Sequence, residues 1–331
     1  MESNTLSRRH AFKLAGLAGA AVALRDTRVF AETPAAAPAT LPQGAGFYRT
    51  HVGELEVTIV SDGSFPLTPY PTFGANASEE AVNNLLNDNF LDPAKLMGQV
   101  NAVVVRKAGG PVTLIDTGCG KLFGPAAGFA LQNLAAAGVK PDDVRHVLFT
   151  HLHPDHAGGA VTDGRKTFPN ATHHVSEQEA SFWTSAQPDF SKSGVPADFQ
   201  PVMIETARNV IKVLEPKRFA PGSELLPGIL PRLTVGHTPG HCVVTIQDGG
   251  QSLVYLGDMV IHHVLVPAHP EWFVGFDTDR EMAVTARQTL LADLAQSRSL
   301  VSGSHLPFPS LGHFKKADAG YAYVPAPWRW A

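Results

Sequence analysis

The sequence predicts an α/β fold in which two β-sheets pack face to face and helices cover the outside. Strand-like segments fall into two groups along the chain, and helix-like segments follow each group. The 331 residues include 44% hydrophobic and 17% charged side chains, a composition typical of a globular protein with a buried core. This length suits one large domain or two modest ones. We assign residues 47–331 to one folded domain.

The first group of strands lies in the N-terminal half of the chain. Leu55–Ser61 alternates and is rich in β-branched residues, which predicts a strand. A hairpin follows over Asn101–Arg106 and Val112–Ile115, with a Gly-Gly-Pro turn between them. Val144–Phe149 is short and almost entirely apolar, as a buried strand is, and Ala171–Val175 is similar.

Four segments carry the helical repeat of apolar residues. They are Phe129–Ala137, which stops before a glycine, Glu177–Ser185, Phe199–Leu214 and Asp279–Gln296, for which Thr278 is a candidate N-cap. The second group of strands is a hairpin over Cys242–Gln247 and Ser252–Leu256, followed by a short strand at Leu300–Val301.

The N-terminal residues predict an export signal rather than part of the fold. Adjacent arginines, Arg8 and Arg9, precede an apolar stretch at Leu14–Leu24 that is too short to span a bilayer. This order resembles a twin-arginine signal over residues 1–31, with cleavage after Ala31. Residues 32–46 are rich in Ala, Pro and Gly and predict a linker. We therefore expect a periplasmic or secreted protein.

Charge and cysteine content exclude several other classes. Removal of residues 1–31 changes the formal net charge from −4 to −7, because five basic and two acidic residues are lost. An acidic surface argues against a nucleic-acid partner. Two cysteines exclude a disulfide scaffold and a CxxC zinc module. Cys119 and Cys242 flank the candidate site, and we expect both to be small packing residues rather than a disulfide.

A dense run of metal-ligand residue types follows the strand that ends near residue 149. Histidine is the commonest metal ligand, and the chain contains 15 of them. His151 and His153 are two residues apart, so in an extended segment both side chains point the same way. Pro154 forces a turn, which lets Asp155 and His156 face a second ion nearby.

Three further positions complete the candidate site. His241 lies with His237 in a glycine-flanked loop, Asp258 ends a predicted strand and His305 follows the last one. Each position alone is a weak signal. Their order and spacing together indicate two metal ions.

The ordered set His-x-His-x-Asp-His, Gly-His-x-x-Gly-His, Gly-Asp and Ser-Gly-Ser-His resembles the metallo-β-lactamase superfamily. The resemblance implies a four-layer αβ/βα sandwich of two mixed β-sheets with helices outside and a two-metal site between the sheets. It implies that one ion is bound by His151, His153 and His241, the other by Asp155, His156 and His305, and both by Asp258. It also implies that Asp116 and His237 support the site by hydrogen bonding.

Further short stretches resemble methyl parathion hydrolase and related lactonases and arylesterases of the dihydrocoumarin hydrolase type. They are Gly46–Arg49, Ser61–Gly63, Asp116–Gly118, Phe182–Trp183 and Ser304–Leu306. The resemblance implies export, a homodimer and a substrate pocket lined by Phe123, Trp183, Phe199 and Phe276. The segment Ile261–Phe276 is bulkier than we expect for an efficient organophosphate hydrolase. Such bulk favours a flat lactone or aryl ester over a tetrahedral phosphotriester.

The chemistry expected of such a site is hydrolysis. Two cations about 3.5–4 Å apart can share a water and lower its pKa toward neutrality. We assign Asp258, together with Asp155, to catalysis, since a carboxylate can steer this water and take up its proton. Nitrogen and oxygen ligands without thiolate suit zinc, and also tolerate manganese, cobalt or iron.

The sequence therefore predicts an exported hydrolase with two divalent ions that acts on small-molecule lactones or aryl esters, with organophosphate triesters as a side activity. The alternative is a dedicated organophosphorus hydrolase. We disfavour a thioesterase because of the pocket aromatics, a β-lactamase because of the bridging Asp258, and a nuclease because of the charge. A flavodiiron-type protein would need Glu at position 153, and an inactive binding protein should have lost a ligand. We expect no membrane contact beyond export.

Overall fold

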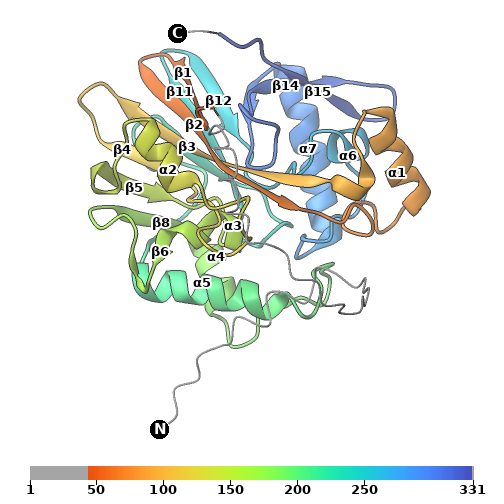
Figure 1. Ribbon diagram of the computed structural model, residues 1–331, viewed down its shortest axis with the longest axis horizontal. Coiled ribbons are helices and arrows are strands. Elements are labelled where there is room, and N and C mark those ends of the chain that lie inside the picture. Colours follow the sequence, from red (N-terminus) through yellow and green to blue (C-terminus); the bar gives the residue numbers. More distant parts are fainter. Residues whose placement is uncertain (1–43, 330–331) are drawn as a thin grey trace, which may run out of the picture. The chain divides into compact units, whose positions relative to one another are not determined.

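The computed structural model describes residues 44–329. The predicted export signal at 1–31, and most of the predicted linker at 32–46, lie outside the described residues. Among the described helices, none is long and apolar enough to cross a membrane. The predicted α/β sandwich is confirmed (Figure 1).

Seven strands form the first sheet, in the order β1-β2-β3-β4-β5-β8-β9. The neighbours from β1 to β4 are antiparallel, whereas those from β4 to β9 are parallel and are joined through helices. The strands are β1 (Phe47–Val52), β2 (Leu55–Pro66), β3 (Met97–Lys107), β4 (Val112–Ile115), β5 (Val144–Leu148), β8 (Thr172–Ser176) and β9 (Lys217–Phe219).

Six strands form the second sheet, in the order β10-β11-β12-β13-β14-β15. Neighbours are antiparallel except for the parallel pair β12 and β13. The strands are β10 (Ile229–Leu233), β11 (Cys242–Asp248), β12 (Gln251–Tyr255), β13 (Leu300–Ser302), β14 (Gly312–Lys316) and β15 (Tyr321–Pro325). A separate small hairpin consists of β6 (Val161–Thr162) and β7 (Arg165–Lys166).

The helices lie on the two outer faces of this sandwich. Those that cover the first sheet are α2 (Ala130–Ala136), α3 (Pro154–Ala157), α4 (Glu177–Thr184) and α5 (Gln200–Leu214). Those that cover the second sheet are α1 (Glu79–Asp88), α6 (Leu265–Ala268) and α7 (Arg280–Ser297). Single turns of 3₁₀-helix occur at Pro93–Lys95, Pro141–Asp143 and Gly158–Ala160. In Figure 1, α1, α6 and α7 gather on the right, away from α2, α4 and α5.

Alternation along each strand explains the layers. In β2, Ile59 packs between the sheets with Tyr255 of the second sheet, while its neighbour Val60 packs on the outer side with Leu134 of α2 and Val210 of α5. The outer face of the second sheet is covered by α1, α6 and α7 in the same way. Successive strand residues point to opposite faces, so a sheet covered on both sides needs such continuous apolar runs.

Every predicted strand and helix is present within one or two residues at most ends, but several elements were not predicted. These are β1, β6, β7, β9, β10, β14, β15 and the helices α1, α3 and α6. The strand predicted at Leu55–Ser61 continues to Pro66, past a register shift at Ser61. The N-cap of α7 is Asp279 rather than Thr278, because the Asp279 side chain accepts a hydrogen bond from the main-chain N–H of Met282.

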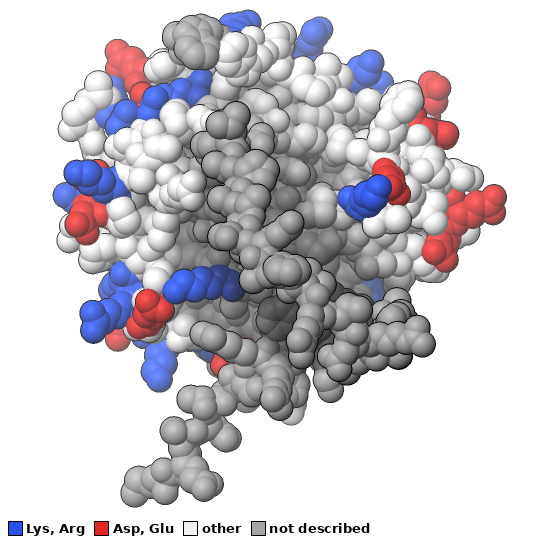
Figure 2. Space-filling view, in the orientation of Figure 1, with Lys and Arg blue, Asp and Glu red and all other residues white. Residues whose placement is uncertain are grey.

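Charged side chains of both signs are mixed on the surface. On the face drawn in Figure 2, Lys and Arg lie among Asp and Glu around the rim. Exposed pairs such as Lys107 with Glu54 and Lys121 with Asp163 illustrate this mixing. Such pairs contribute little to stability, but they leave no extended field of one sign on that part of the described surface.

Candidate metal centre

The ligand-type residues converge at one edge of the sandwich because of strand direction. The parallel strands β4, β5 and β8 end at this edge, and so do the parallel strands β12 and β13. The antiparallel strand β11 begins there. Loops after residues 115, 148, 255 and 302, and the loop before residue 242, therefore meet at one place, as is usual for binding sites of α/β proteins.

The first of two buried clusters contains His151, His153, His237 and Asp258. The Nε2 atom of His237 lies 2.9 Å from Nδ1 of His153 and 3.2 Å from Nε2 of His151. It lies 3.3 Å from Oδ2 of Asp258. The segment after β5 is extended, so the two histidines at positions i and i+2 point the same way, as expected.

The second cluster contains Asp155, His156, Asp258 and His305. The Nε2 atom of His156 lies 3.0 Å from Oδ1 of Asp258, and Nε2 of His305 lies 3.2 Å from Oδ2 of the same residue. Pro154 begins the single helical turn α3, which carries Asp155 and His156 to the second cluster, although the His156 ring still lies 4.1 Å from that of His151, centroid to centroid. Asp258 belongs to both clusters and lies between them.

The residues present fit divalent metal ions. The buried atom His153 Nε2 has no hydrogen-bond partner, and His156 Nε2 lies among carboxylate oxygens, Oδ1 of Asp258 at 3.0 Å and Oδ2 of Asp155 at 3.6 Å. Buried polar atoms without partners are rare in folded proteins, and a bound ion is one of their ordinary explanations. Burial lowers the pKa of His151 and of His153 well below the usual value, so both rings are neutral and can offer a lone pair.

In the second cluster, neighbouring carboxylates raise the pKa values of the histidines. Burial alone would lower the pKa of His305, but the carboxylates of Asp258 and Asp155 outweigh it and raise this pKa to about 10. Asp258 and Asp155 likewise raise the pKa of His156 well above its usual value, against the effect of burial. A cation bound here would therefore replace protons that the carboxylates otherwise hold on the histidines.

His237 and His241 both lie beside the first cluster, and the expected roles, His241 as metal ligand and His237 as its support, stay a prediction. The His237 ring reaches the cluster directly, and each ring nitrogen of His241 has a partner. Its Nδ1 lies 3.0 Å from Thr234 Oγ1, and its Nε2 accepts a hydrogen bond from the main-chain N–H of Asp258 at 3.0 Å. Gly236, with φ of +120°, turns the chain so that His237 faces the cluster. The sequence spacing carries no signal for this orientation.

Oxygen atoms hold the second ring nitrogen of His156 and of His305. Asp116, as expected, supports the site: it accepts hydrogen bonds from Thr150 N at 2.8 Å, from Thr150 Oγ1 at 2.8 Å and from His156 Nδ1 at 2.9 Å. Nδ1 of His305 lies 2.5 Å from the carbonyl oxygen of Gln99. Such partners fix the orientation of each ring and raise its basicity.

A buried ion pair behind His237 was not predicted. Nδ1 of His237 lies 3.0 Å from Oδ1 of Asp277, and Arg287 Nη2 donates to Oδ2 of Asp277 at 2.8 Å. Both members of the pair are buried. Burial alone would lower the pKa of His237, but Asp258 and Asp277 raise it to about 8. The signal in the sequence is Arg287 itself, which lies on the apolar face of α7 and needs a buried partner.

A small apolar cavity of about 40 Å³ lies above the two clusters. Its floor includes His153, Asp155, Asp258 and His305, and its walls are Phe65, Leu67, Phe123, Phe199, Met203, Ile261 and Phe276. Phe123, Phe199 and Phe276 thus lie where the sequence analysis expected pocket residues. Trp183 does not: it is fully buried, its Nε1 donates to Glu179 at 2.6 Å, and its ring meets His153 edge-on from behind.

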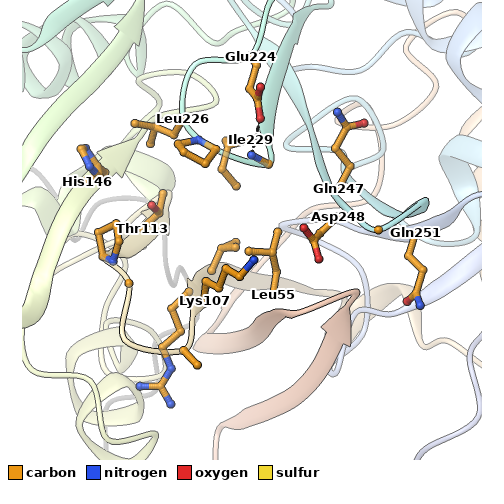
Figure 3. Close-up of a pocket in the computed structure, with 18 of the residues that line it drawn as sticks. Leu55, Lys107, Thr113, His146, Glu224, Leu226, Ile229, Gln247, Asp248 and Gln251 are labelled. Atoms are coloured by element: carbon orange, nitrogen blue, oxygen red, sulfur yellow. Dashed lines mark hydrogen bonds between the residues drawn. The ribbon is translucent and has the colours of Figure 1, made fainter.

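A larger cavity of about 880 Å³ opens at the opposite edge of the sandwich (Figure 3). It is lined mainly by hairpin turns, including those that carry Lys107 and Asp248, with Thr113 and His146 deeper inside. Both metal-ligand clusters of the described residues lie at the other edge. The size of this cavity therefore does not make it the reactive site.

Comparison with known proteins agrees with this geometry. Residues 97–305 match the metallo-beta-lactamase superfamily. This chain belongs to that superfamily. The metallo-β-lactamase match begins at β3 and ends at His305, so it includes every residue of the two clusters.

Three known proteins are similar over half of the chain or more. AidC, described as a dizinc quorum-quenching lactonase in complex with a product, N-hexnoyl-L-homoserine, is 30% identical with a TM-score of 0.80, covering 86% of this chain and 98% of AidC. The hydrolase AbOPH is 31% identical with a TM-score of 0.79, covering 87% and 100%. The uncharacterized protein YobT of Bacillus subtilis (strain 168) is 31% identical over 181 residues, covering 50% of this chain and 70% of YobT.

Proposed function

We propose that this protein is an exported, binuclear metal-dependent hydrolase that acts on lactones or aryl esters, with organophosphate triesters as secondary substrates. The observation that carries the proposal is the pair of clusters that share Asp258 at the floor of an apolar cavity. The similarity to AidC supports a lactone substrate and zinc as the metal. The stretches that resemble methyl parathion hydrolase support the secondary activity.

The residues of the two clusters would bind two metal ions in the following way. His151, His153 and His241 would hold one ion, with His237 beside them, Asp155, His156 and His305 the other, and Asp258 both. When bound, two divalent ions would polarise an ester carbonyl and make water a stronger nucleophile near neutral pH.

Two carboxylates remain available for proton transfer. The neighbouring histidines lower the pKa of Asp258 well below its usual value and lower that of Asp155 as well, although burial alone would raise both. Both groups are therefore ionised at neutral pH and able to accept a proton from an attacking water. Asp155 is slightly exposed to the cavity, so its carboxylate would lie beside a substrate bound there.

The cavity walls select the kind of substrate. Phenylalanines at 65, 123, 199 and 276 offer flat apolar surfaces, and Phe65 stacks on Phe123 with ring centroids 4.7 Å apart. The described residues that line this cavity include no Lys or Arg. A neutral ester is therefore favoured over an anionic substrate, such as a β-lactam with its carboxylate.

The test is a comparison of kcat/KM on zinc-loaded protein for dihydrocoumarin, acyl-homoserine lactones, an aryl acetate, methyl parathion and a cephalosporin. We expect the lactones or the aryl acetate to lead. Methyl parathion ahead by two orders of magnitude would favour the alternative, a dedicated organophosphorus hydrolase.

Variants of the site test metal dependence. His153→Ala and Asp258→Ala should lose metal and several hundredfold or more in activity, since each removes a metal-binding side chain. His51→Ala, at an exposed histidine of β1, is the matched control and should keep wild-type activity. Full activity in either site variant would contradict the assignment.

Export and dimerisation are separate parts of the proposal. The adjacent arginines Arg8 and Arg9 support export, and Arg8→Lys combined with Arg9→Lys should retain the protein inside the cell. Sedimentation of the purified protein tests the homodimer, for which a monomer at all concentrations is the contrary result. The acidic charge of the mature chain and the mixed surface of Figure 2 support a small-molecule substrate rather than nucleic acid.

A further inference from the structure

Glu179 is a fully buried carboxylate that the proposed chemistry does not use. It is the third residue of α4, and Glu177 two positions earlier is half-exposed. The spacing Ser176-x-x-Glu179 is that of a capping box, in which the glutamate would bond back to the start of its own helix. Ser176 does accept a hydrogen bond from Glu179 N at 3.2 Å, but the Glu179 carboxylate points elsewhere.

The carboxylate instead connects two loops that carry metal-ligand residues. Oε1 accepts hydrogen bonds from the main-chain N–H of Leu152 at 2.9 Å and from Trp183 Nε1 at 2.6 Å. Oε2 accepts from the hydroxyl of Thr238 at 2.5 Å and from the main-chain N–H of Gly240 at 3.1 Å. Leu152 lies between His151 and His153, and Thr238 follows His237, so one side chain spans both halves of the first cluster.

Main-chain packing at the same place strengthens this connection. A Cβ atom on Gly240 would lie 2.0 Å from Glu179 N, so the loop approaches the helix as closely as only glycine permits. The hydroxyl of Ser176 donates to the carbonyl oxygen of Gly240 at 2.7 Å. The first turn of α4 thus holds the loop of His237 from its main chain as well as through Glu179.

Four donors for two oxygens explain why a carboxylate can be buried here. An ionised carboxylate has about four acceptor positions, and each is engaged. Because these bonds involve a charged acceptor, they are stronger and more directional than bonds to a neutral amide. The cost of burying the charge is thereby offset, and the position of each loop is fixed relative to the other.

We infer that Glu179 is a positioning residue that sets the separation of the His151–His153 loop and the His237 loop, and thereby the metal affinity of the first cluster. The inference rests on the proposed metal dependence. It concerns a side chain that neither touches the cavity nor belongs to either cluster. Outer partners of metal ligands commonly change metal affinity about ten- to hundredfold when they are replaced.

Glu179→Gln tests the inference with little change of shape. Whichever way the amide turns, its NH₂ group meets an N–H group, either that of Leu152 or that of Gly240, so one loop loses its acceptor. Glu177→Gln is the matched control, since it makes the same change two residues away on the same helix, where the side chain is half-exposed.

Thr238 provides a second pair of variants in case Glu179→Gln folds poorly. Thr238→Val removes only the hydroxyl that donates to Glu179, and Thr238→Ser keeps it. Zinc affinity is measured on the metal-free full-length chain by competition with a chromophoric chelator. The melting temperature of the metal-free protein is recorded alongside it.

We expect Glu179→Gln to weaken zinc binding about ten- to hundredfold, and Glu177→Gln to leave it unchanged. Thr238→Val should weaken binding by a smaller factor, and Thr238→Ser should restore it. Wild-type zinc affinity in Glu179→Gln, with only a lower melting temperature, would overturn the inference and leave the proposed function intact. A wild-type chain that binds no divalent metal would overturn both.

Discussion

The buried pair of Asp277 and Arg287 behind His237 gives the sharpest stability prediction. Asp277→Asn keeps the shape of the side chain but removes its charge, which leaves the Arg287 guanidinium buried without a counter-ion. Removing one partner of a buried ion pair costs about 3–5 kcal/mol. Arg287 still donates to the carbonyl oxygens of Met259 at 3.0 Å and Trp272 at 3.3 Å, so we expect the lower end, about 3 kcal/mol.

The assay is urea unfolding at pH 7 with metal removed by a chelator, so that lost metal binding does not add to the change. A loss of about 3 kcal/mol would lower the melting temperature by about 6–12 °C in a domain of this size. Asp293→Asn is the control. It breaks an exposed pair with Arg232, whose atoms lie 3.9 Å apart, and should change stability by about 0.5 kcal/mol or less.

The sign of the pH dependence follows from the pKa of Asp277. Burial alone would raise this pKa, but the guanidinium of Arg287 and the His237 ring lower it. A lowered folded-state pKa stabilises the protein above the unfolded pKa, and the effect is lost as pH falls through the folded value. The difference between wild type and Asp277→Asn should therefore shrink below about pH 4.

A double variant isolates the pair. Asp277→Asn with Arg287→Met removes both charges, and we expect it to be more stable than Asp277→Asn alone. A free energy of unfolding of Asp277→Asn within about 1 kcal/mol of wild type would refute the reasoning, because a guanidinium left buried without a counter-ion should destabilise the protein by more than that. A double variant less stable than the single one would show that the guanidinium contributes mainly through its carbonyl bonds.

Three further predictions concern the metal centre and its neighbours. His241→Ala should weaken zinc binding more than His237→Ala, for which a loss of about tenfold is expected; the reverse order would contradict the ligand assignment. Because the pKa of His305 is about 10 and that of His237 about 8 without metal, zinc binding at pH 7 should release protons and strengthen as pH rises. Calorimetry in buffers of different ionisation enthalpy checks this, and an affinity independent of pH would count against it. Cys119 and Cys242 are free and buried, so both thiols should react with a thiol reagent only after denaturation, without reductant.

The local part of this architecture could be predicted from the sequence. The strands at Leu55–Ser61 and Val144–Phe149 could be recognised from the sequence, because the burial of a strand determines which of its own consecutive residues are apolar. The strands β14 and β15 were not predicted because most of their residues are at least partly exposed. Their pairing partner, rather than an apolar pattern, defines them.

The same distinction applies to the site. His151 to His156 could be found because they are neighbours in the sequence. How His237 and His241 are each oriented beside the cluster depends on the turn at Gly236 and on contact with a distant helix, and four residues of spacing do not contain that information. The roles of Glu179 and Asp277 could not be predicted for a similar reason, because their hydrogen-bond partners lie on separate elements of the fold.

The distribution of the ligands along the chain has a consequence for biosynthesis. His151 and His305 are contributed by different sheets, and Asp258 completes both clusters from between them in the sequence. The last of these residues is synthesised well after the first sheet. Neither cluster can therefore be assembled on the first sheet alone, and metal loading would follow the docking of the two sheets. The supply of metal where folding finishes, rather than where synthesis starts, would then decide which ion the protein carries.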